Sequence, residues 1–146
     1  MTMRIYIDNC CFNRPFDDQS QIRIRLESEA KLRIQDDIIE GKFEFVWSYI
    51  LEAENKANPF EERTNAIADW KKQSIAKIKE NKTILDKAKY LKEIGLRSKD
   101  AIHISCAIFA KCKYFLTTDD KILNKNNLIE EITVIDPLGF VKEVYL

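Results

Sequence analysis

Four acidic side chains stand at comparable places in this sequence, each just after a predicted strand or near the start of a predicted helix. They are Asp8, Glu54, Asp100 and Asp119. Taken singly, an acid at such a place is more often a surface residue or a helix cap. Clustered carboxylates repel one another, and a hard divalent cation compensates that repulsion; ligation by oxygen alone favours magnesium or manganese over zinc. The four acids are therefore the candidate metal-ligating and catalytic residues.

Two of these acids have a close competitor in the sequence. Glu52 and Glu54 point about 200° apart on a helix, so only one of them can face the site. We favour Glu54 because of its spacing from Ser48, which begins that helix. Asp119 is favoured over Asp120 because it directly follows the threonines at a strand end. Asp120 is then a helix cap or an outer metal ligand through water.

Alternating apolar patterns predict the elements that must position these acids. Strands are expected at residues 3–7, 43–47, 114–116 and 133–135, with a last extended piece at 141–145. Helices are expected at 20–40 with Ser20 as N-cap and Gly41 as stop, from Ser48 to 57, from 60 through Ile78, from near Asn81 to Gly95, from an N-cap at Ser98 through Ile108, and briefly around 122–123. Strands that alternate with helices predict a mainly parallel sheet covered on both faces, with sites at the carboxyl ends of its strands.

Composition indicates one globular domain that spans residues 1–146. The 146 residues are 45% hydrophobic and 33% charged, and 24 basic residues balance 24 acidic ones. The charge separates locally, because residues 63–99 hold 11 Lys and Arg against 4 Asp and Glu, a net charge of +7. Lysine-rich helices are commonly only solvated surfaces. Beside an acidic site, however, a helical basic arm at about 60–97 would hold a polyanion against carboxylates that repel it.

Several classes of protein are excluded by residues that the chain lacks. It has only three glycines, more than forty residues apart, so it carries neither of the glycine-rich phosphate loops. Its single histidine excludes zinc sites that need two imidazoles. The four cysteines lack metal-binding or disulfide spacing, which favours reduced thiols in a cytoplasmic protein. The first residues are apolar over too short a run for a secretory core or a spanning helix, so we expect no export and no membrane insertion.

Two segments resemble the PIN-domain family, including VapC-type toxins. They are Arg4 to Pro15 (RIYIDNCCFNRP) and Ser98 to Leu123 (SKDAIHISCAIFAKCKYFLTTDDKIL), and the matches extend in order along the whole chain. The resemblance implies a PIN-like three-layer α/β/α sandwich with a central, mainly parallel sheet. It also implies a homodimeric endoribonuclease that uses Mg²⁺ or Mn²⁺ to hydrolyse single-stranded RNA, often as the toxin paired with an antitoxin protein. The family's acids correspond here to Asp8, Glu54, Asp100 and Asp119.

The sequence departs from the family pattern directly after the first acid. The family commonly has Asp-Thr-Asn there, whereas this chain has Asp8, Asn9 and Cys10, so cysteine replaces a polar side chain that orients the site. The residues at Asp8 and Cys10 also bear on two rival functions. One is phosphoryl transfer through an aspartyl intermediate on Asp8, although the second aspartate that it needs is Cys10 here. The other is a catalytically silent module that binds protein.

A histidine, two cysteines and an arginine also lie near the predicted site. His103 lies one helical turn after Asp100, but a lone histidine on an apolar helix is more often packed than functional. Cys10 and Cys11 have no basic partner in the sequence and are expected to be small buried residues outside the mechanism. Arg14 lies in the loop over the strand ends, where its guanidinium would suit a phosphate oxygen.

Overall fold

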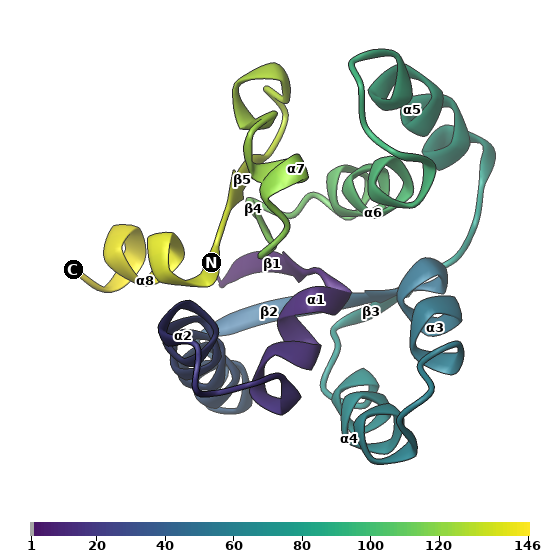
Figure 1. The fold of residues 1–146 in the computed structure, drawn as a ribbon. Coiled ribbons are helices and arrows are strands. Elements are labelled where there is room, and N and C mark those ends of the chain that lie inside the picture. Colours follow the sequence, from purple (N-terminus) through teal and green to yellow (C-terminus); the bar gives the residue numbers. More distant parts are fainter. Residues whose placement is uncertain (1) are drawn as a thin grey trace.

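The computed structural model describes residues 2–146 and consists of one parallel sheet with helices on both faces (Figure 1). The sheet order is β3-β2-β1-β4-β5, and every neighbouring pair is parallel. The strands are β1 (Met3–Ile7), β2 (Phe43–Ser48), β3 (Ala76–Ile78), β4 (Tyr114–Leu116) and β5 (Thr133–Ile135). The predicted α/β sandwich with a central parallel sheet is confirmed.

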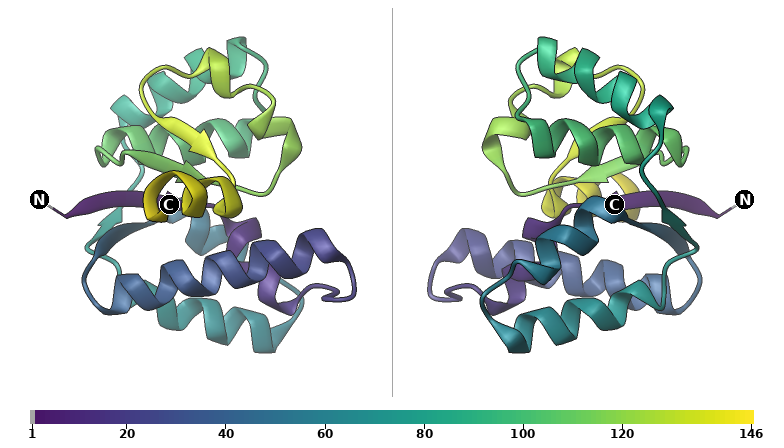
Figure 2. Two further views of the ribbon diagram at one scale, coloured as in Figure 1. Left: turned by 90° about the vertical axis from the view of Figure 1, so that its left-hand side faces the viewer. Right: turned by 90° about the vertical axis from the view of Figure 1, so that its right-hand side faces the viewer.

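Helices pack on the two faces of the sheet. The helices are α1 (Asn9–Asn13), α2 (Ile22–Ile39), α3 (Tyr49–Lys56), α4 (Glu61–Lys71), α5 (Lys82–Glu93), α6 (Ser98–Phe109), α7 (Asp120–Leu123) and α8 (Pro137–Tyr145), with short 3-10 turns η1 (Arg14–Phe16) and η2 (Asn126–Leu128). Helices α5 and α6 lie on one side of the sheet, and α2 and α4 lie on the other (Figures 1 and 2). No helix among residues 2–146 is both long and apolar enough to span a membrane.

The central strand β1 is buried on both faces, as a strand inside a parallel sheet must be. On the face toward α6, the ring of Tyr6 meets His103 of that helix and stacks on Phe115 of β4, with centroids 5.2 Å apart in the second pair. On the opposite face, Phe45 meets Phe12 of α1 and Trp70 of α4. These apolar layers hold the carboxyl ends of β1, β2 and β4 at one edge of the sheet.

Residues 76–78 form strand β3 instead of extending the helix before them, so that part of the prediction was wrong. Helix α4 ends at Lys71, and the backbone N–H of Ile75 then donates to the carbonyl of Phe45 at 2.8 Å. Ala76 pairs with Val46 from there on. The spacing of Ile75 and Ile78 fits a helix face, but the open edge of β2 offers backbone partners that a helix at this place would leave unused.

Residues 141–145 belong to helix α8, and the predicted extended piece was wrong. Asp136 accepts a hydrogen bond from the backbone N–H of Gly139 at 2.7 Å, and Pro137 occupies the first helical turn. An aspartate cap followed by proline is a helix-starting signal. The β-branched residues of this segment favour a strand locally. The helix is stabilised instead by the burial of Phe140 against Phe43 and Tyr114.

The starts of α3 and α5 and the ends of α2 and α5 were predicted correctly. Ser48 caps α3 by accepting from the N–H of Leu51 at 3.2 Å, and Asn81 caps α5. Gly41 and Gly95 follow α2 and α5 with φ of +80° and +105°, a conformation that favours glycine.

Two predicted N-caps were misplaced. Ser20 instead donates its hydroxyl hydrogen to Asp18, and α2 begins after Gln21 with no side-chain cap. Ser98 is the first residue of α6, and the residue before it, Arg97, holds the N-cap position. This shift places the side chain of Arg97 at the carboxyl edge of the sheet.

The basic segment is not a continuous helical arm. Strand β3 separates α4 from α5, and the two helices lie on opposite faces of the sheet (Figure 2). Its positive charge is therefore divided between the two helical layers.

Candidate functional site

Asp8 is fixed at the carboxyl end of the central strand. Its side chain caps α1, with Oδ1 accepting from the N–H of Asn9 at 2.8 Å. Its other oxygen, Oδ2, accepts from the hydroxyl of Thr117 at 2.8 Å and from the thiol of Cys10 at 3.4 Å. Asp8 is only 6% exposed, so these hydrogen-bond partners fix the position of its carboxylate.

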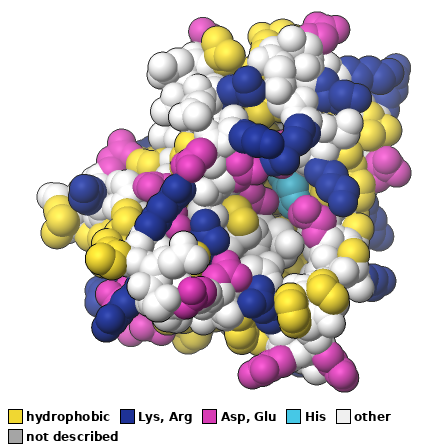
Figure 3. All heavy atoms as spheres, viewed as in Figure 1, with side chains coloured by type: hydrophobic (Ala, Val, Ile, Leu, Met, Phe, Trp, Pro, Cys, Tyr) yellow, Lys and Arg dark blue, Asp and Glu magenta, His cyan; other side chains and the backbone are white. Residues whose placement is uncertain are grey.

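Glu54 and His103 lie against Asp8. One ligating atom from each of the three residues falls within 4.8 Å of the others. Nε2 of His103 hydrogen-bonds Oε1 of Glu54 and lies 3.7 Å from Oδ1 of Asp8. Figure 3 shows this histidine in cyan between acidic side chains, with Lys and Arg side chains around them. The three residues come from β1, α3 and α6, which meet only in the folded chain.

Glu52 points away from this group. Its Oε1 accepts from Nε1 of Trp47 at 3.0 Å and from Nζ of Lys71 at 2.8 Å. The hydrogen bond from Lys71 is the main cause of a lowered pKa at Glu52, against the opposing effect of burial and with help from Trp47. Of the two glutamates, the structure brings only Glu54 to Asp8.

His103 is buried, as a packed histidine would be, and each of its two nitrogens has a hydrogen-bond partner. Nδ1 lies 2.6 Å from the hydroxyl of Tyr6, which in turn lies 2.7 Å from Oγ of Ser48. Burial disfavours the charged ring, but the hydrogen bond to Glu54 and the charge of Asp8 outweigh it, so the pKa of His103 is raised. The burial confirms the expected packed histidine, and its place one helical turn after Asp100 was the sequence signal for its contact with Glu54.

Asp100 and Asp119 are joined through Arg97. Nε of Arg97 donates to Oδ2 of Asp100 at 2.8 Å, and Nη2 donates to Oδ2 of Asp119 at 2.5 Å. Asp119 also caps α7 by accepting from the N–H of Lys121 at 2.9 Å. Burial is the first cause of a raised pKa at Asp100; Arg97 opposes it, and the charges of Asp8 and Asp119 add to it. The negative charges of Asp8 and Asp119 thus both act on the carboxyl group of Asp100.

Two neighbouring charged residues are engaged elsewhere. Asp120 receives two hydrogen bonds from Arg23, each 2.8 Å long, on the exposed side of α7. Arg14 donates to the buried carboxylate of Glu27 at 2.9 Å and to Asp17 at 3.1 Å. The guanidinium expected to meet a phosphate therefore ties η1 to α2.

The donors of this site suit a hard divalent cation. Carboxylate oxygens predominate, with one imidazole nitrogen beside them. Between Asp100 and Asp119 a guanidinium already stands where positive charge is needed. A cleft lined by Glu54, Arg97, Ser98, Lys99 and Asp100 opens onto the acids. The site is thus acidic at its floor and basic at its rim.

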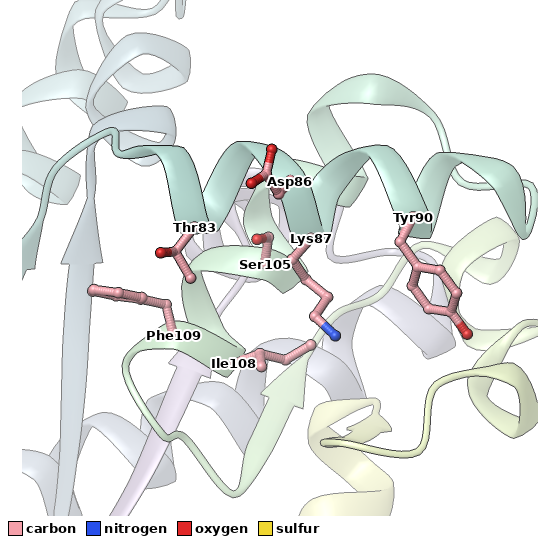
Figure 4. A pocket seen from close by; sticks show the side chains of 7 residues that line it. All are labelled: Thr83, Asp86, Lys87, Tyr90, Ser105, Ile108 and Phe109. Carbon is pink, nitrogen blue, oxygen red and sulfur yellow. The ribbon is translucent and has the colours of Figure 1, made fainter.

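A separate hollow lies between α5 and α6. Its walls include Thr83, Lys87, Tyr90 and Phe109, and Figure 4 shows Lys87 reaching toward Ile108 while Asp86 points away. Asp86 is the only acidic residue among those that line it.

Comparison with known proteins supports the fold assignment through structure alone. No protein-family model matches the sequence, and no curated protein matches it. A chain of VapBC2 from Rickettsia felis, solved bound to a DNA fragment from its promoter, superposes with a TM-score of 0.58 and 11% identity. The superposition covers 90% of this chain and 97% of that one. The chain therefore has the PIN-like fold of VapC, as its two sequence segments indicated.

Proposed function

We propose, on the basis of this PIN-like fold, that the chain is a cytoplasmic, metal-dependent endoribonuclease that hydrolyses phosphodiester bonds of single-stranded RNA. One observation carries the proposal. Asp8 and Glu54, far apart in the sequence, lie with His103 in one group of potential ligands. Asp100 shares a cleft with Glu54, and Arg97 bridges Asp100 to Asp119. Clustered carboxylates suit a compensating divalent cation, and phosphodiester hydrolysis is chemistry that such a cation supports.

The four acids would hold Mg²⁺ or Mn²⁺. The bound cation would neutralise charge on the scissile phosphate and lower the pKa of an attacking water. Thr117 and the N–H of Asn9 hold the two oxygens of Asp8 in place, and His103 holds Glu54. Side chains fixed in this way need not reorganise when substrate arrives.

Basic residues that line the clefts beside the acids would offset the repulsion between these acids and an RNA backbone. Lys121 and Lys125 line a cleft together with Arg97 and Asp100, and Lys99 lines the cleft beside Glu54. Phosphates can contact these ammonium groups while the scissile bond lies over the carboxylates. This arrangement supports a polyanionic substrate.

A protein partner and a second copy of the chain complete the proposal. The Rickettsia felis structure is that of a VapBC2 assembly on promoter DNA. We infer by analogy that this chain is the toxin of a toxin–antitoxin pair and acts as a homodimer.

The second candidate is a silent protein-binding module, and Cys10 favours it. A thiol is a weaker hydrogen-bond donor than a hydroxyl or amide, and here it is the Cys10 thiol that contacts Oδ2 of Asp8 from this position, at 3.4 Å. An aspartyl phosphotransferase is disfavoured because the second aspartate that it needs is replaced by Cys10.

Cleavage of a labelled single-stranded RNA tests the proposal. The purified protein is assayed with Mn²⁺, with EDTA, and as the Asp8→Asn variant, with Asp69→Asn on the exposed surface of α4 as a matched control. We expect cleavage by the wild type and by Asp69→Asn only, with Asp8→Asn still folded. Undiminished cleavage by Asp8→Asn would sink the proposal, and failure of the folded wild type to bind Mn²⁺ would favour the silent module.

A further inference from the structure

The two halves of the acidic site face different nitrogen-bearing side chains. Asp8 and Glu54 face His103, which is buried and cannot move away without disrupting α6. Asp100 and Asp119 face Arg97, whose side chain is 57% exposed. Its guanidinium spans the two carboxylates like a bridge, with 2.8 Å to Asp100 and 2.5 Å to Asp119.

We propose that Arg97 is an internal competitor for the divalent cation, and that a cation can bind between Asp100 and Asp119 only when the Arg97 side chain has swung out. This inference rests on the proposed metal dependence of the site and adds a control on its loading. Arg97 thereby sets the cation affinity of one half of the site.

Competition follows from the atoms that Arg97 uses. It occupies Oδ2 of both aspartates, and a guanidinium has hydrogen-bond donors but no atom that can ligate a metal. A cation between the same oxygens would stand beside a second positive charge. Charge-assisted hydrogen bonds are stronger than neutral ones, so the loss of these two bonds opposes cation loading.

The fold leaves room for the side chain to move. Arg97 is the N-cap residue of α6, and its backbone carbonyl accepts from the N–H of Ala101 at 2.9 Å whichever way the side chain points. A cleft of about 330 Å³ lies beside it, lined also by Leu96, Lys121 and Asn124. The swing thus requires side-chain rotation and no change in the helix.

Titration of the intact chain with Mn²⁺, followed by electron paramagnetic resonance of the free ion, tests this inference without any cleavage assay. The variant is Arg97→Gln, which removes the charge and keeps most of the side-chain volume. Lys99→Gln is the matched control, because it removes one positive charge from the same cleft without contacting either aspartate. Thermal unfolding of each protein with and without Mn²⁺ gives a second readout.

We expect Arg97→Gln to bind Mn²⁺ about tenfold more tightly than the wild type, and Lys99→Gln to change affinity less than about twofold. Without Mn²⁺, Arg97→Gln should melt at a lower temperature than wild type, and Mn²⁺ should raise its melting temperature by more. Equal tightening in both variants would show only a loss of general repulsion and would overturn the inference, as would unchanged affinity in Arg97→Gln. These two results leave the proposed metal dependence intact. Absence of Mn²⁺ binding in all three proteins would overturn both.

Discussion

The hydroxyl of Tyr6 lies 2.6 Å from Nδ1 of His103, on the opposite side of the imidazole from the carboxylate of Glu54. A neutral ring that accepts from Tyr6 carries its proton on Nε2 and donates it to Glu54. Ser48 completes the chain at 2.7 Å from the same phenol oxygen. A buried residue of the central strand thus orients a side chain at the sheet edge, much as outer partners orient metal ligands.

Replacing Tyr6 by phenylalanine should destabilise the protein. The variant leaves Nδ1 of buried His103 and Oγ of Ser48 without their shared partner, which costs about 1–3 kcal/mol in the free energy of unfolding. Urea denaturation measures the change. Tyr90→Phe is the control, because Tyr90 is half exposed and its hydroxyl has no hydrogen-bond partner among residues 2–146. Equal stability of the Tyr6→Phe variant and the wild type would show that the hydrogen bonds of the Tyr6 hydroxyl to Ser48 and His103 do not contribute to folding.

Glu54→Gln and Glu52→Gln form a matched pair for the site. Both lie on α3, but only Glu54 reaches Asp8 and His103, whereas Glu52 bonds Trp47 and Lys71. We expect Glu54→Gln to lower Mn²⁺-dependent RNA cleavage at least about 100-fold, and Glu52→Gln to leave it within about threefold. Gel assays at saturating Mn²⁺ report both rates. Loss of cleavage in Glu52→Gln alone would reverse the assignment.

The sheet was predictable from the sequence because its central strands carry their own signal. Met3–Ile7 and Tyr114–Leu116 are short apolar runs closed by polar residues, and both became central strands. Strand β3 has no such signal. Ala76, Lys77 and Ile78 gain their strand conformation from the edge of β2, which is a partner in space and not in sequence.

The candidate acids could be found in the sequence because each lies just after a predicted strand or inside a helix whose start is marked by a capping residue. The spacing from Ser48 that the family resemblance implies favoured Glu54 over Glu52, and the structure brings Glu54 to Asp8. The roles of His103 and Arg97 were not predictable in the same way. Each depends on which atoms face it from another element, and the periodicity of α6 alone describes only which side of the helix is buried.

Thr117 links Asp8 to Asp119 and should be needed at the site despite having no titratable group. Its hydroxyl donates to Oδ2 of Asp8 at 2.8 Å and accepts from the N–H of Asp119 at 3.1 Å. Thr117→Val keeps the shape and removes both bonds, so we expect a loss of about 1–3 kcal/mol in stability and about tenfold weaker Mn²⁺ binding. Calorimetric titration measures the affinity.

The adjacent residue provides the control for that experiment. The hydroxyl of Thr118 forms no hydrogen bond within the described chain, so Thr118→Val should leave Mn²⁺ affinity within about twofold of wild type. Thr117→Ser, which keeps the hydroxyl, should restore most of the affinity. If valine at either position had the same effect, the bond from Thr117 to Asp8 would not be what orders the carboxylate.

Lys31 gives the stability of this protein a dependence on pH that is unrelated to the acidic site. It is 4% exposed on α2, and its Nζ faces the rings of Phe12 and Trp70, with no carboxylate in ion-pair range within residues 2–146. Burial lowers its pKa from 10.5 to about 7, with a small opposing effect of Cys11. Between these two pKa values the unfolded chain binds a proton that the folded chain does not, so this contribution to stability rises with pH across the window and is at its minimum below pH 7.

Lys31→Met removes the ammonium group and keeps the length of the side chain, so it should stabilise the protein most where the wild type must bury a charge. We expect a gain of about 1–3 kcal/mol at pH 6 that shrinks steadily toward pH 10, measured by urea denaturation at several pH values. Lys72→Met on the exposed end of α4 should change stability little and equally at every pH. A gain in Lys31→Met that is the same at pH 6 and pH 9.5 would mean that methionine only packs better. A loss at pH 6 would mean that the charged Lys31, stabilised by the faces of Phe12 and Trp70, is the form the fold requires.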